Sequence, residues 1–195
     1  MNMTVTRISP KYSITDWKSI AFATEKDWQK AIDVLRDRIE GRFVRPIRLI
    51  ESYEYSGFAV LALDCLLMET LQQFKEGLPE SKGSRATFKR FLMTSTFKSY
   101  FDDAKSSLFY DQIRCGILHQ AETKKSSKIV TKKSAPLVAY SHDSKGLVVN
   151  RRLCHAQLMT EFEDYLSNLR DPSNLALRDN FRKKMNHICR MHNQI

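Results

Sequence analysis

The chain has 195 residues, of which 42% are hydrophobic and 28% are charged, and its net charge is +10. This composition predicts one soluble globular domain over residues 1–195 and excludes fibrous, disordered and repeat proteins. The four cysteines show no CxxC spacing, and residues 1–15 hold no apolar stretch of signal-peptide length. We therefore expect a cytoplasmic protein with free thiols.

The positive charge is concentrated in two segments. Residues 75–100 carry a net charge of +4 and residues 121–152 carry +6, so these two segments account for the whole excess. Such clusters favour a nucleic-acid partner, because each phosphate contact releases counterions; the alternative is a basic surface that only keeps the chain in solution. The lysines expected to bind RNA are Lys124, Lys125, Lys128, Lys132 and Lys133.

The first predicted elements are two helices. Apolar residues at intervals of three or four predict an amphipathic helix over residues 24–41, with Thr24 as its N-cap and Pro46 kinking or ending it. The run from Gly57 to Leu71 is apolar on nearly every side, which indicates a buried central helix. Its fifteen residues fall short of the ~20 that a membrane span needs, so no membrane partner is expected.

A basic loop at residues 77–83 separates these helices from the next two. Helices are predicted from about Ser84 to Thr94 and from about Asp102 to Glu122. The apolar stripe of the second of these helices consists of Tyr110, Ile113, Ile117 and Ala121.

Short β-type runs follow at residues 129–131, 137–140 and 147–150, and the turn-rich SHDSKG between the last two predicts a β-hairpin insertion at about 128–150. Helices then resume, with a stop at Asp171-Pro172 between them. Their predicted apolar faces are Leu153, Ala156, Met159, Phe162, Leu166 and Leu169, then Leu177, Phe181, Met185 and Ile188. The expected fold is all-α, an up-and-down helical bundle with one small β-hairpin insertion.

The helix from Asp102 contains YDQIRCGILHQAETK, in which four residues separate Arg114 from His119. The spacing is common by chance, and Arg182 and His187 share it. The first pair differs in its context, since it lies on a strongly patterned helix and leads directly into the densest lysine cluster. It also encloses Gly116, where a backbone or a ligand can approach closely.

The segment IRCGILHQAETK resembles the signature of HEPN domains, an Arg followed after four to six residues by a His. HEPN domains are all-helical bundles that often act as metal-independent RNases in toxin–antitoxin, abortive-infection and CRISPR-linked defence systems. The resemblance implies a homodimeric endoribonuclease with Arg114 and His119 as its catalytic pair, no metal or cofactor, and an antitoxin or other regulatory partner. Two positions depart from it: Cys115 replaces the Asn, Asp or His of many active members, and Ala121 replaces a modified Tyr.

The chemistry of the two residue types agrees with this role. A histidine that titrates near neutrality can move protons to and from the oxygens of RNA, and an arginine binds phosphate oxygens while keeping its charge. Five positions on an ideal helix turn through about 140°, so Arg114 and His119 project in different directions. Two copies of the helix meeting across a two-fold axis would complete one cleft, and we therefore expect a homodimer.

Several alternatives stay open. Arg114 could instead pair with Asp111 or Glu122 beside a half-buried His119, and Glu69 could form a structural ion pair or support Arg114. Cys115 favours a non-catalytic RNA- or nucleotide-binding module, and a helical scaffold for a protein partner is a third class. Two weaker sites are a Cys115–His119 thiolate–imidazole pair and a zinc site drawn from Cys154, His155, His187, Cys189 and His192.

Overall fold

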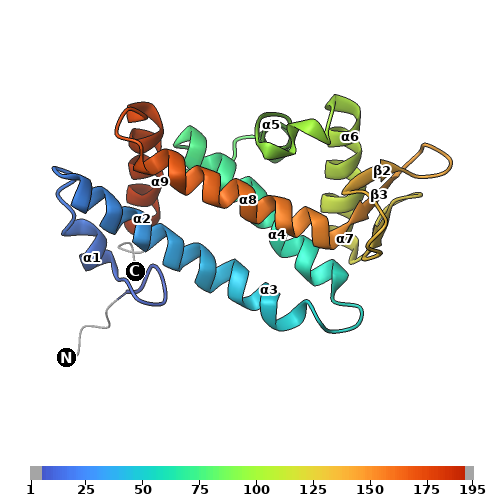
Figure 1. Cartoon of the computed structure of the whole chain (residues 1–195), viewed down its shortest axis with the longest axis horizontal. Coiled ribbons are helices and arrows are strands. Elements are labelled where there is room, and N and C mark those ends of the chain that lie inside the picture. The colour runs from blue at the N-terminus through green and yellow to red at the C-terminus, as the bar shows by residue number, and fades with distance from the viewer. Residues whose placement is uncertain (1–5, 192–195) are drawn as a thin grey trace. The chain divides into compact units, whose positions relative to one another are not determined.

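The structure is a computed structural model that describes residues 6–191 of the chain. It is mainly helical with one three-stranded sheet, which confirms the mainly α class (Figure 1). The elements, in chain order, are α1 (Ile14–Lys18), α2 (Glu25–Ile39), the π-helical turn η1 (Glu40–Val44), α3 (Arg45–Ile50), α4 (Gly57–Glu76), α5 (Ser84–Thr94), the 3-10 turn η2 (Thr96–Ser99), α6 (Asp103–Leu108), the π-helical turn η3 (Phe109–Arg114), α7 (Cys115–Gln120), β1 (Lys128–Val130), β2 (Val138–Tyr140), β3 (Leu147–Asn150), α8 (Arg151–Arg170) and α9 (Leu175–Met191).

The described chain divides into two compact units of discontinuous sequence. Unit 1 comprises residues 6–48, 73–80 and 163–191, and unit 2 comprises residues 49–72 and 81–162. Helices α4 and α8 contribute residues to both units, so the division falls within helices as well as in loops. The single domain expected over residues 1–195 stays a prediction.

In unit 1, helix α2 begins with a reciprocal cap. The Thr24 hydroxyl accepts a hydrogen bond from the backbone N–H of Asp27 at 3.2 Å, and the Asp27 carboxylate accepts one from the N–H of Thr24 at 3.1 Å. The two bonds satisfy N–H groups that have no partner within the helix. The predicted N-cap is confirmed.

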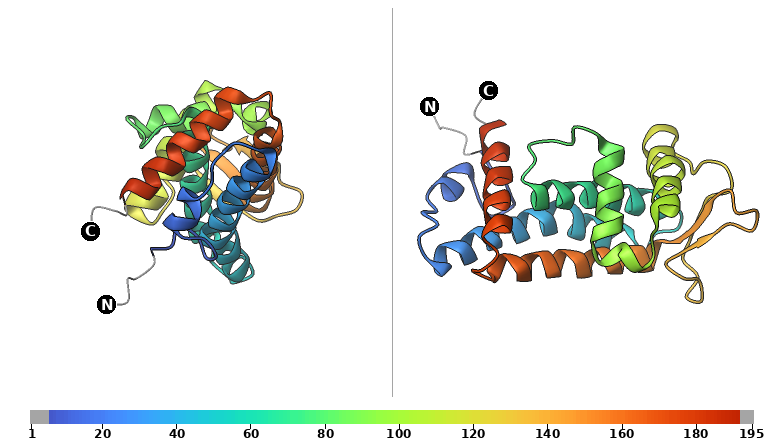
Figure 2. Two further views of the ribbon diagram at one scale, coloured as in Figure 1. Left: turned by 90° about the vertical axis from the view of Figure 1, so that its left-hand side faces the viewer. Right: turned by 90° about the horizontal axis from the view of Figure 1, so that it is seen from above.

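Also in unit 1, the buried Arg178 ties α9 to the start of α2. Its guanidinium makes two hydrogen bonds with the Glu25 carboxylate, at 2.8 and 2.6 Å, and lies 4.6 Å from the ring centroid of Trp28. Figure 2 shows α9 passing across this end of α2. Five aromatic side chains pack beside it with ring centroids 5.0 to 6.5 Å apart: Trp17, Phe22, Trp28, Phe74 and Phe181.

The first long helix extends beyond its predicted end at residue 41, because η1 and α3 continue it to Ile50; of the two effects predicted for Pro46, ending the helix is therefore wrong. In η1 the backbone N–H of Arg45 donates to the carbonyl of Glu40, five residues earlier. A π turn of this kind is one residue wider than an α turn. It gives room to a proline ring that would otherwise clash with the preceding turn.

Helix α4 confirms the buried central helix. Most of its side chains between Val60 and Leu71 are buried, whereas Leu66 is 42% exposed. The helix has 20 residues and contains an 18-residue window with a mean hydropathy of 1.2, so by length and composition it could cross a membrane; the expectation that it does not stays a prediction. Half of that window is buried inside the protein.

In unit 2, residues 103–120 form one helix that contains a π turn. Asp102 caps this helix by accepting a hydrogen bond from the N–H of Lys105 at 2.7 Å. Ile113 and Ile117 are buried as predicted, but Tyr110, within the π turn, is only half-buried, and Ala121 is exposed because α7 ends at Gln120 and Ala121 has a left-handed φ. The side chains buried by this helix are Ser106, Phe109, Gln112, Ile113 and Ile117.

Helix α5 has the predicted bounds and lies beside α6 (Figure 2). Its Phe88 ring stacks on Phe109 with centroids 5.7 Å apart, and Phe101 meets Phe109 edge-on at 5.5 Å. These rings form the apolar contact between the two helices.

Strands β2 and β3 form the predicted hairpin, with Ala139 opposite Val148. Strand β1 adds a parallel partner to β3, with Ile129 opposite Val149, so the strand order is β1-β3-β2. The sequence did not indicate this third pairing, because a parallel neighbour has no tight turn to mark it.

The first half of the predicted apolar face of α8 is wrong, since Leu153 is 42% exposed and Ala156 is exposed. Residues 154 and 158 fit the same helical period equally well, so only the neighbouring helices decide which face is buried. The buried apolar side chains are Cys154, Leu158, Phe162, Tyr165, Leu166 and Leu169. The predicted stop after Arg170 is confirmed, as are the buried Phe181, Met185 and Ile188 of α9.

Helix α7 ends in a tight chain reversal. Ala121 has a left-handed φ of 54°, and the N–H of Lys124 donates to the carbonyl of Gln112 at 2.9 Å. The returning chain lies so close that a Cβ at Gly116 would be 2.4 Å from the carbonyl oxygen of Glu122. Gly116 is therefore needed for the approach of backbone, which is one of the two roles expected for it.

We predict that Gly116→Ala lowers the free energy of unfolding by about 1–3 kcal/mol, because the added methyl group overlaps a backbone carbonyl. Chemical denaturation followed by circular dichroism measures the change. Gly57→Ala in the same unit is the control, since a Cβ there would meet no atom closer than 3.5 Å. Equal unfolding free energies for the two variants would contradict the role of Gly116.

Candidate functional site

Groups from three elements hold Arg114 at the end of η3. Its Nη2 donates a hydrogen bond to Oε2 of Glu69 on α4 at 3.1 Å, and Oγ of Ser84 on α5 donates to the same oxygen at 3.0 Å. The guanidinium carbon lies 5.3 Å from the ring centroid of Tyr110. The side chains of Arg114 and Glu69 are 14% and 12% exposed, so the pair is fixed at the edge of the core.

The Glu69 carboxylate stabilises the charge on Arg114. Burial has the largest single effect and lowers the pKa of Arg114, but Glu69, Tyr110 and Cys115 together raise it by more, so the net shift is upward. An ion pair at about 4 Å in a partly buried setting attracts by about 4 kcal/mol, most of which is offset by lost hydration. The guanidinium thus remains charged and oriented, with a small part of its surface open to solvent.

The two acidic side chains considered as alternative partners of Arg114 are engaged elsewhere. Asp111 pairs with Arg85 at 2.8 Å, and Glu122 accepts a hydrogen bond from the N–H of Thr123 at 2.8 Å. Pairing of Arg114 with either of them is therefore wrong. The ion pair expected of Glu69 is confirmed, and its partner is Arg114.

His119 lies in the last turn of α7 with an exposed side chain, so the half-buried histidine of that alternative is wrong. It makes no hydrogen bond within residues 6–191, and none joins it to Arg114 or to Cys115. A single chain therefore presents an oriented arginine and a separate, unpaired histidine. The thiolate–imidazole alternative has no supporting contact.

A buried polar network joins this helix to the basic segment. The Ser127 hydroxyl donates to Oε1 of Gln112 at 2.8 Å and accepts from the N–H of Leu147 at 2.9 Å. Nε2 of Gln112 donates to the carbonyl of Lys145 at 2.9 Å. A Cβ at Gly146 would lie 2.5 Å from the nitrogen of Ser127, so the hairpin and the basic segment approach at backbone distance.

The predicted RNA-binding lysines lie on both sides of Ser127 along the chain. Lys124 and Lys125 lie in the chain reversal after α7, Lys128 begins β1, and Lys132 and Lys133 lie in the loop after β1. Lys124 is half-buried, and the other four side chains are exposed. Within the part of the chain that the structure describes, none of the five forms an ion pair, so their charges are available to a ligand.

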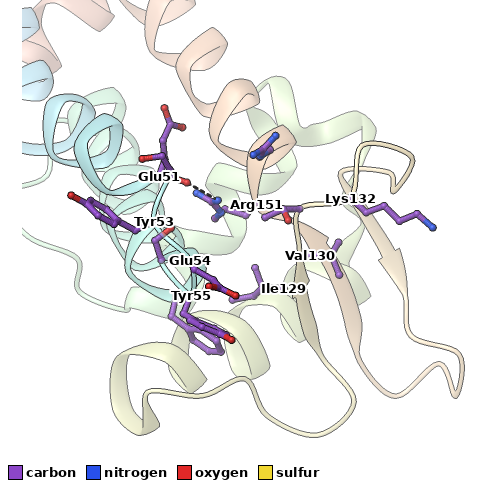
Figure 3. A pocket seen from close by; sticks show the side chains of 14 residues that line it. Glu51, Tyr53, Glu54, Tyr55, Ile129, Val130, Lys132 and Arg151 are labelled. Atoms are coloured by element: carbon purple, nitrogen blue, oxygen red, sulfur yellow. Dashed lines mark hydrogen bonds between the residues drawn. The ribbon is translucent and has the colours of Figure 1, made fainter.

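Sequence reasoning missed a pocket in unit 2 with a volume of 690 Å³ (Figure 3). The pocket lies among the loop after α3, the end of β1 and the start of α8, and of the predicted site residues only Lys132 lines it. Arg151 and Arg152 lie at the end of the basic segment 121–152. Two features of the sequence indicate the pocket: the two adjacent arginines at the start of a helix and the two tyrosines of ESYEYS.

A buried histidine–aspartate pair was also missed. Nδ1 of His155 on α8 lies 2.8 Å from Oδ1 of Asp64 on α4, whose side chain is fully buried. Burial raises the pKa of Asp64, and the hydrogen bond from His155 and the charge of Arg151 oppose that shift. His155 had been considered only as a zinc ligand. Residues 6–191 hold no group of three or more His, Cys, Asp or Glu side chains arranged for a metal ion, and His192 lies outside the described residues.

No protein-family model, curated protein or solved structure matches this chain. The HEPN resemblance therefore rests on the Arg114 to His119 segment alone, and what it implies about function stays a prediction. The geometry of the site has to support any function by itself.

The anchoring of the basic segment can be tested through Asp143. Its carboxylate accepts hydrogen bonds from the hydroxyls of Ser126 and Ser141 and from the N–H of Lys145, and these bonds hold the pKa of Asp143 well below its ordinary value. A lowered native pKa means that the stabilisation is present above the ordinary pKa of the carboxyl group and is lost as the pH falls through the native value.

We predict that an NMR pH titration finds Asp143 protonating below its ordinary range, and that Ser126→Ala raises the midpoint, because Ser126 supplies the largest of these effects. Ser134→Ala is the control, since this exposed serine makes no hydrogen bond among residues 6–191. An unchanged midpoint in Ser126→Ala would show that the basic segment is not held by this contact.

Proposed function

We propose that this protein is a metal-independent endoribonuclease of HEPN type with an up-and-down helical bundle, acting in the cytoplasm as a toxin or an anti-phage effector. The observation that carries the proposal is the orientation of Arg114 by Glu69 and Ser84, on a helix that leads into five lysines without acidic partners. Free thiols at all four cysteines support a reducing compartment.

The proposed reaction needs one proton acceptor, one proton donor and one phosphate ligand. His119 removes the proton of a ribose 2′-OH, the 2′-oxygen forms a bond to phosphorus, and the bond from phosphorus to the 5′-oxygen breaks. A histidinium then protonates the departing 5′-oxygen. Arg114 binds the non-bridging phosphate oxygens, on which charge accumulates in the transition state. The products are a 2′,3′-cyclic phosphate and a 5′-hydroxyl.

A homodimer is part of the proposal. Arg114 and His119 share no contact within one chain and point in directions about 140° apart on an ideal helix. Two copies of this helix related by a two-fold axis would supply two arginines and two histidines to one cleft. One histidine could then accept the proton while the other donates it. An antitoxin or another regulatory partner that covers this cleft would keep the enzyme silent.

We predict that the purified protein cleaves end-labelled RNA in EDTA and that Arg114→Ala and His119→Ala each reduce cleavage at least about 100-fold, as expected for loss of an acid–base or charge-stabilising group. Arg182→Ala and His187→Ala are matched controls, because this pair has the same spacing on α9 and should leave activity unchanged.

Circular dichroism separates catalysis from folding. Arg114→Ala leaves Glu69 without its cation, so that variant needs an unfolding measurement and a companion, Arg114→Lys, that keeps the charge. His119 makes no contact that its replacement could break, and its variant should fold normally. Wild-type cleavage rates in a folded His119→Ala protein would overturn the assignment.

A second candidate is a non-catalytic RNA-binding module. It is favoured by the engagement of Arg114 with Glu69, which leaves the arginine only 14% exposed, and by Cys115 in place of the usual polar residue. In this case the lysines alone would provide the function.

For the binding module we predict salt-sensitive RNA binding without cleavage, lost when Lys124, Lys125 and Lys128 are all changed to glutamate. Each phosphate contact removed should lower the slope of log affinity against log salt by about one. A single Lys128→Glu change is compared with Lys26→Glu, an exposed lysine on α2. Equal effects of the two changes, measured by fluorescence anisotropy, would show that no defined lysine surface binds RNA.

A further inference from the structure

The 690 Å³ pocket of unit 2 is lined by aromatic, cationic and hydroxyl-binding groups (Figure 3). The loop after α3 supplies two tyrosines, the segment after β1 supplies Lys132, and the start of α8 supplies two arginines. Neither Arg114 nor His119 lines it. It is therefore a separate site from the one proposed to cleave RNA.

Arg151 is a buried cation that forms no ion pair within residues 6–191, although its charge acts on the buried Asp64. The residue is 5% exposed, and its only hydrogen bond within residues 6–191 runs from Nη2 to the carbonyl of Glu51 at 3.1 Å. Its buried Nε has no hydrogen-bond partner, and it forms no ion pair in the described chain. Arg114 and Arg178 each contact a carboxylate, whereas Arg38 on α2 resembles Arg151 in donating to a backbone carbonyl, and burial lowers the pKa of Arg38 to about 10. A buried guanidinium left in this state is stabilised when a ligand supplies the anion.

Two further cations and two carboxylates line the same pocket. Arg152 and Lys132 are exposed, and neither forms an ion pair within residues 6–191. Glu51 and Glu54 are exposed acids at its wall. Three cations, one of them the buried guanidinium of Arg151, line the pocket and suit a phosphate, whereas exposed carboxylates can accept hydrogen bonds from sugar hydroxyls.

The tyrosines supply an exposed aromatic surface. Tyr53 is 69% exposed and Tyr55 is 90% exposed, although large aromatic side chains normally gain stability by burial. Tyr55 also has a left-handed φ of 63°, a strained conformation for a residue with a bulky side chain. Exposed aromatic rings next to cations are the arrangement on which nucleobases stack.

His155 extends this chemistry to an adjoining pocket of 470 Å³, which shares Glu51, Ser52, Arg151 and Arg152 with the first one. Asp64 accepts the Nδ1 side of the imidazole at 2.8 Å, so the ring has a set orientation and its Nε2 is left without a partner in the described chain. An oriented imidazole beside two arginines is a further group that can contact a phosphate oxygen.

We propose that this pocket binds one phosphorylated nucleoside unit, either as a free mononucleotide or as a unit of single-stranded RNA. Arg151 and Arg152 contact the phosphate, Tyr53 and Tyr55 stack on the base, and Glu54 binds the ribose hydroxyls. The site binds its ligand independently of cleavage at Arg114 and His119. It would therefore regulate the enzyme or bind the RNA strand.

Isothermal titration calorimetry on full-length His119→Ala protein tests the site without cleavage of the ligand. The probes are inorganic phosphate, adenosine, AMP and a five-nucleotide RNA. The expected result is binding of AMP or of the oligonucleotide more tightly than of phosphate or adenosine alone. Binding of AMP identifies a free nucleotide, and binding of the oligonucleotide alone identifies an RNA strand.

Substitutions at exposed positions are expected to leave the fold intact. Tyr55→Ala and Arg152→Ala should each weaken binding about tenfold or more, as expected from loss of a stacked base or a phosphate contact. Tyr140→Ala and Arg190→Ala, exposed residues outside the pocket, should bind as the parent does. Arg151→Met tests the buried cation, with its unfolding free energy measured in parallel.

No binding of any probe, or equal affinities in the pocket and control variants, would overturn the proposal. Failure of RNA cleavage by the wild-type protein would leave it intact, since these titrations use protein that lacks His119.

Discussion

An ionised carboxylate in an apolar helix costs several kcal/mol unless a cation reaches it, and Glu69 on α4 is in that position. Arg114 meets this requirement from η3, and Ser84 of α5 adds a hydrogen bond to the same oxygen. The pairing therefore ties three helical segments of unit 2 together. It also orients the one guanidinium whose neighbours along the chain resemble a catalytic signature.

The π turn η3 gives this pairing its geometry. Arg114 is the last residue of that turn, so the extra backbone residue determines the face of the helix from which its side chain leaves. The same turn makes Gln112 a buried residue, which holds the basic segment through Ser127. One local irregularity thus directs both the arginine and the lysines that follow it.

Unit 2 contains two arginines, Arg114 and Arg151, whose charges are compensated in different ways. Arg114 has its carboxylate within the protein, so its charge is neutralised before any ligand arrives. Within the described residues Arg151 donates to a carbonyl and forms no ion pair, and its Nε has no partner, so its guanidinium is available to pair with an external anion. The first arrangement favours a fixed orientation of the guanidinium. The second favours affinity for an anionic ligand, because only an unneutralised buried cation gains a full ion pair on binding.

Much of this protein could be read from local sequence. The cap at Thr24, the bounds of α5, the hairpin around SHDSKG and the stop after Arg170 depend on residues within a few positions, and all are confirmed. The charge clusters and the lone Glu69 were likewise visible, because composition and hydrophobic period are properties of short segments.

Tertiary structure decided what depends on distant partners. Which carboxylate pairs with Arg114, which face of α8 is buried, that β1 joins β3 and that Asp64 meets His155 all involve residues from separate elements. Helical period allows more than one such choice, and the backbone shift of a π turn leaves no mark in residue spacing. Sequence alone determined the helices and the charge of this protein, whereas packing between elements determined which charges are satisfied and which remain to bind a ligand.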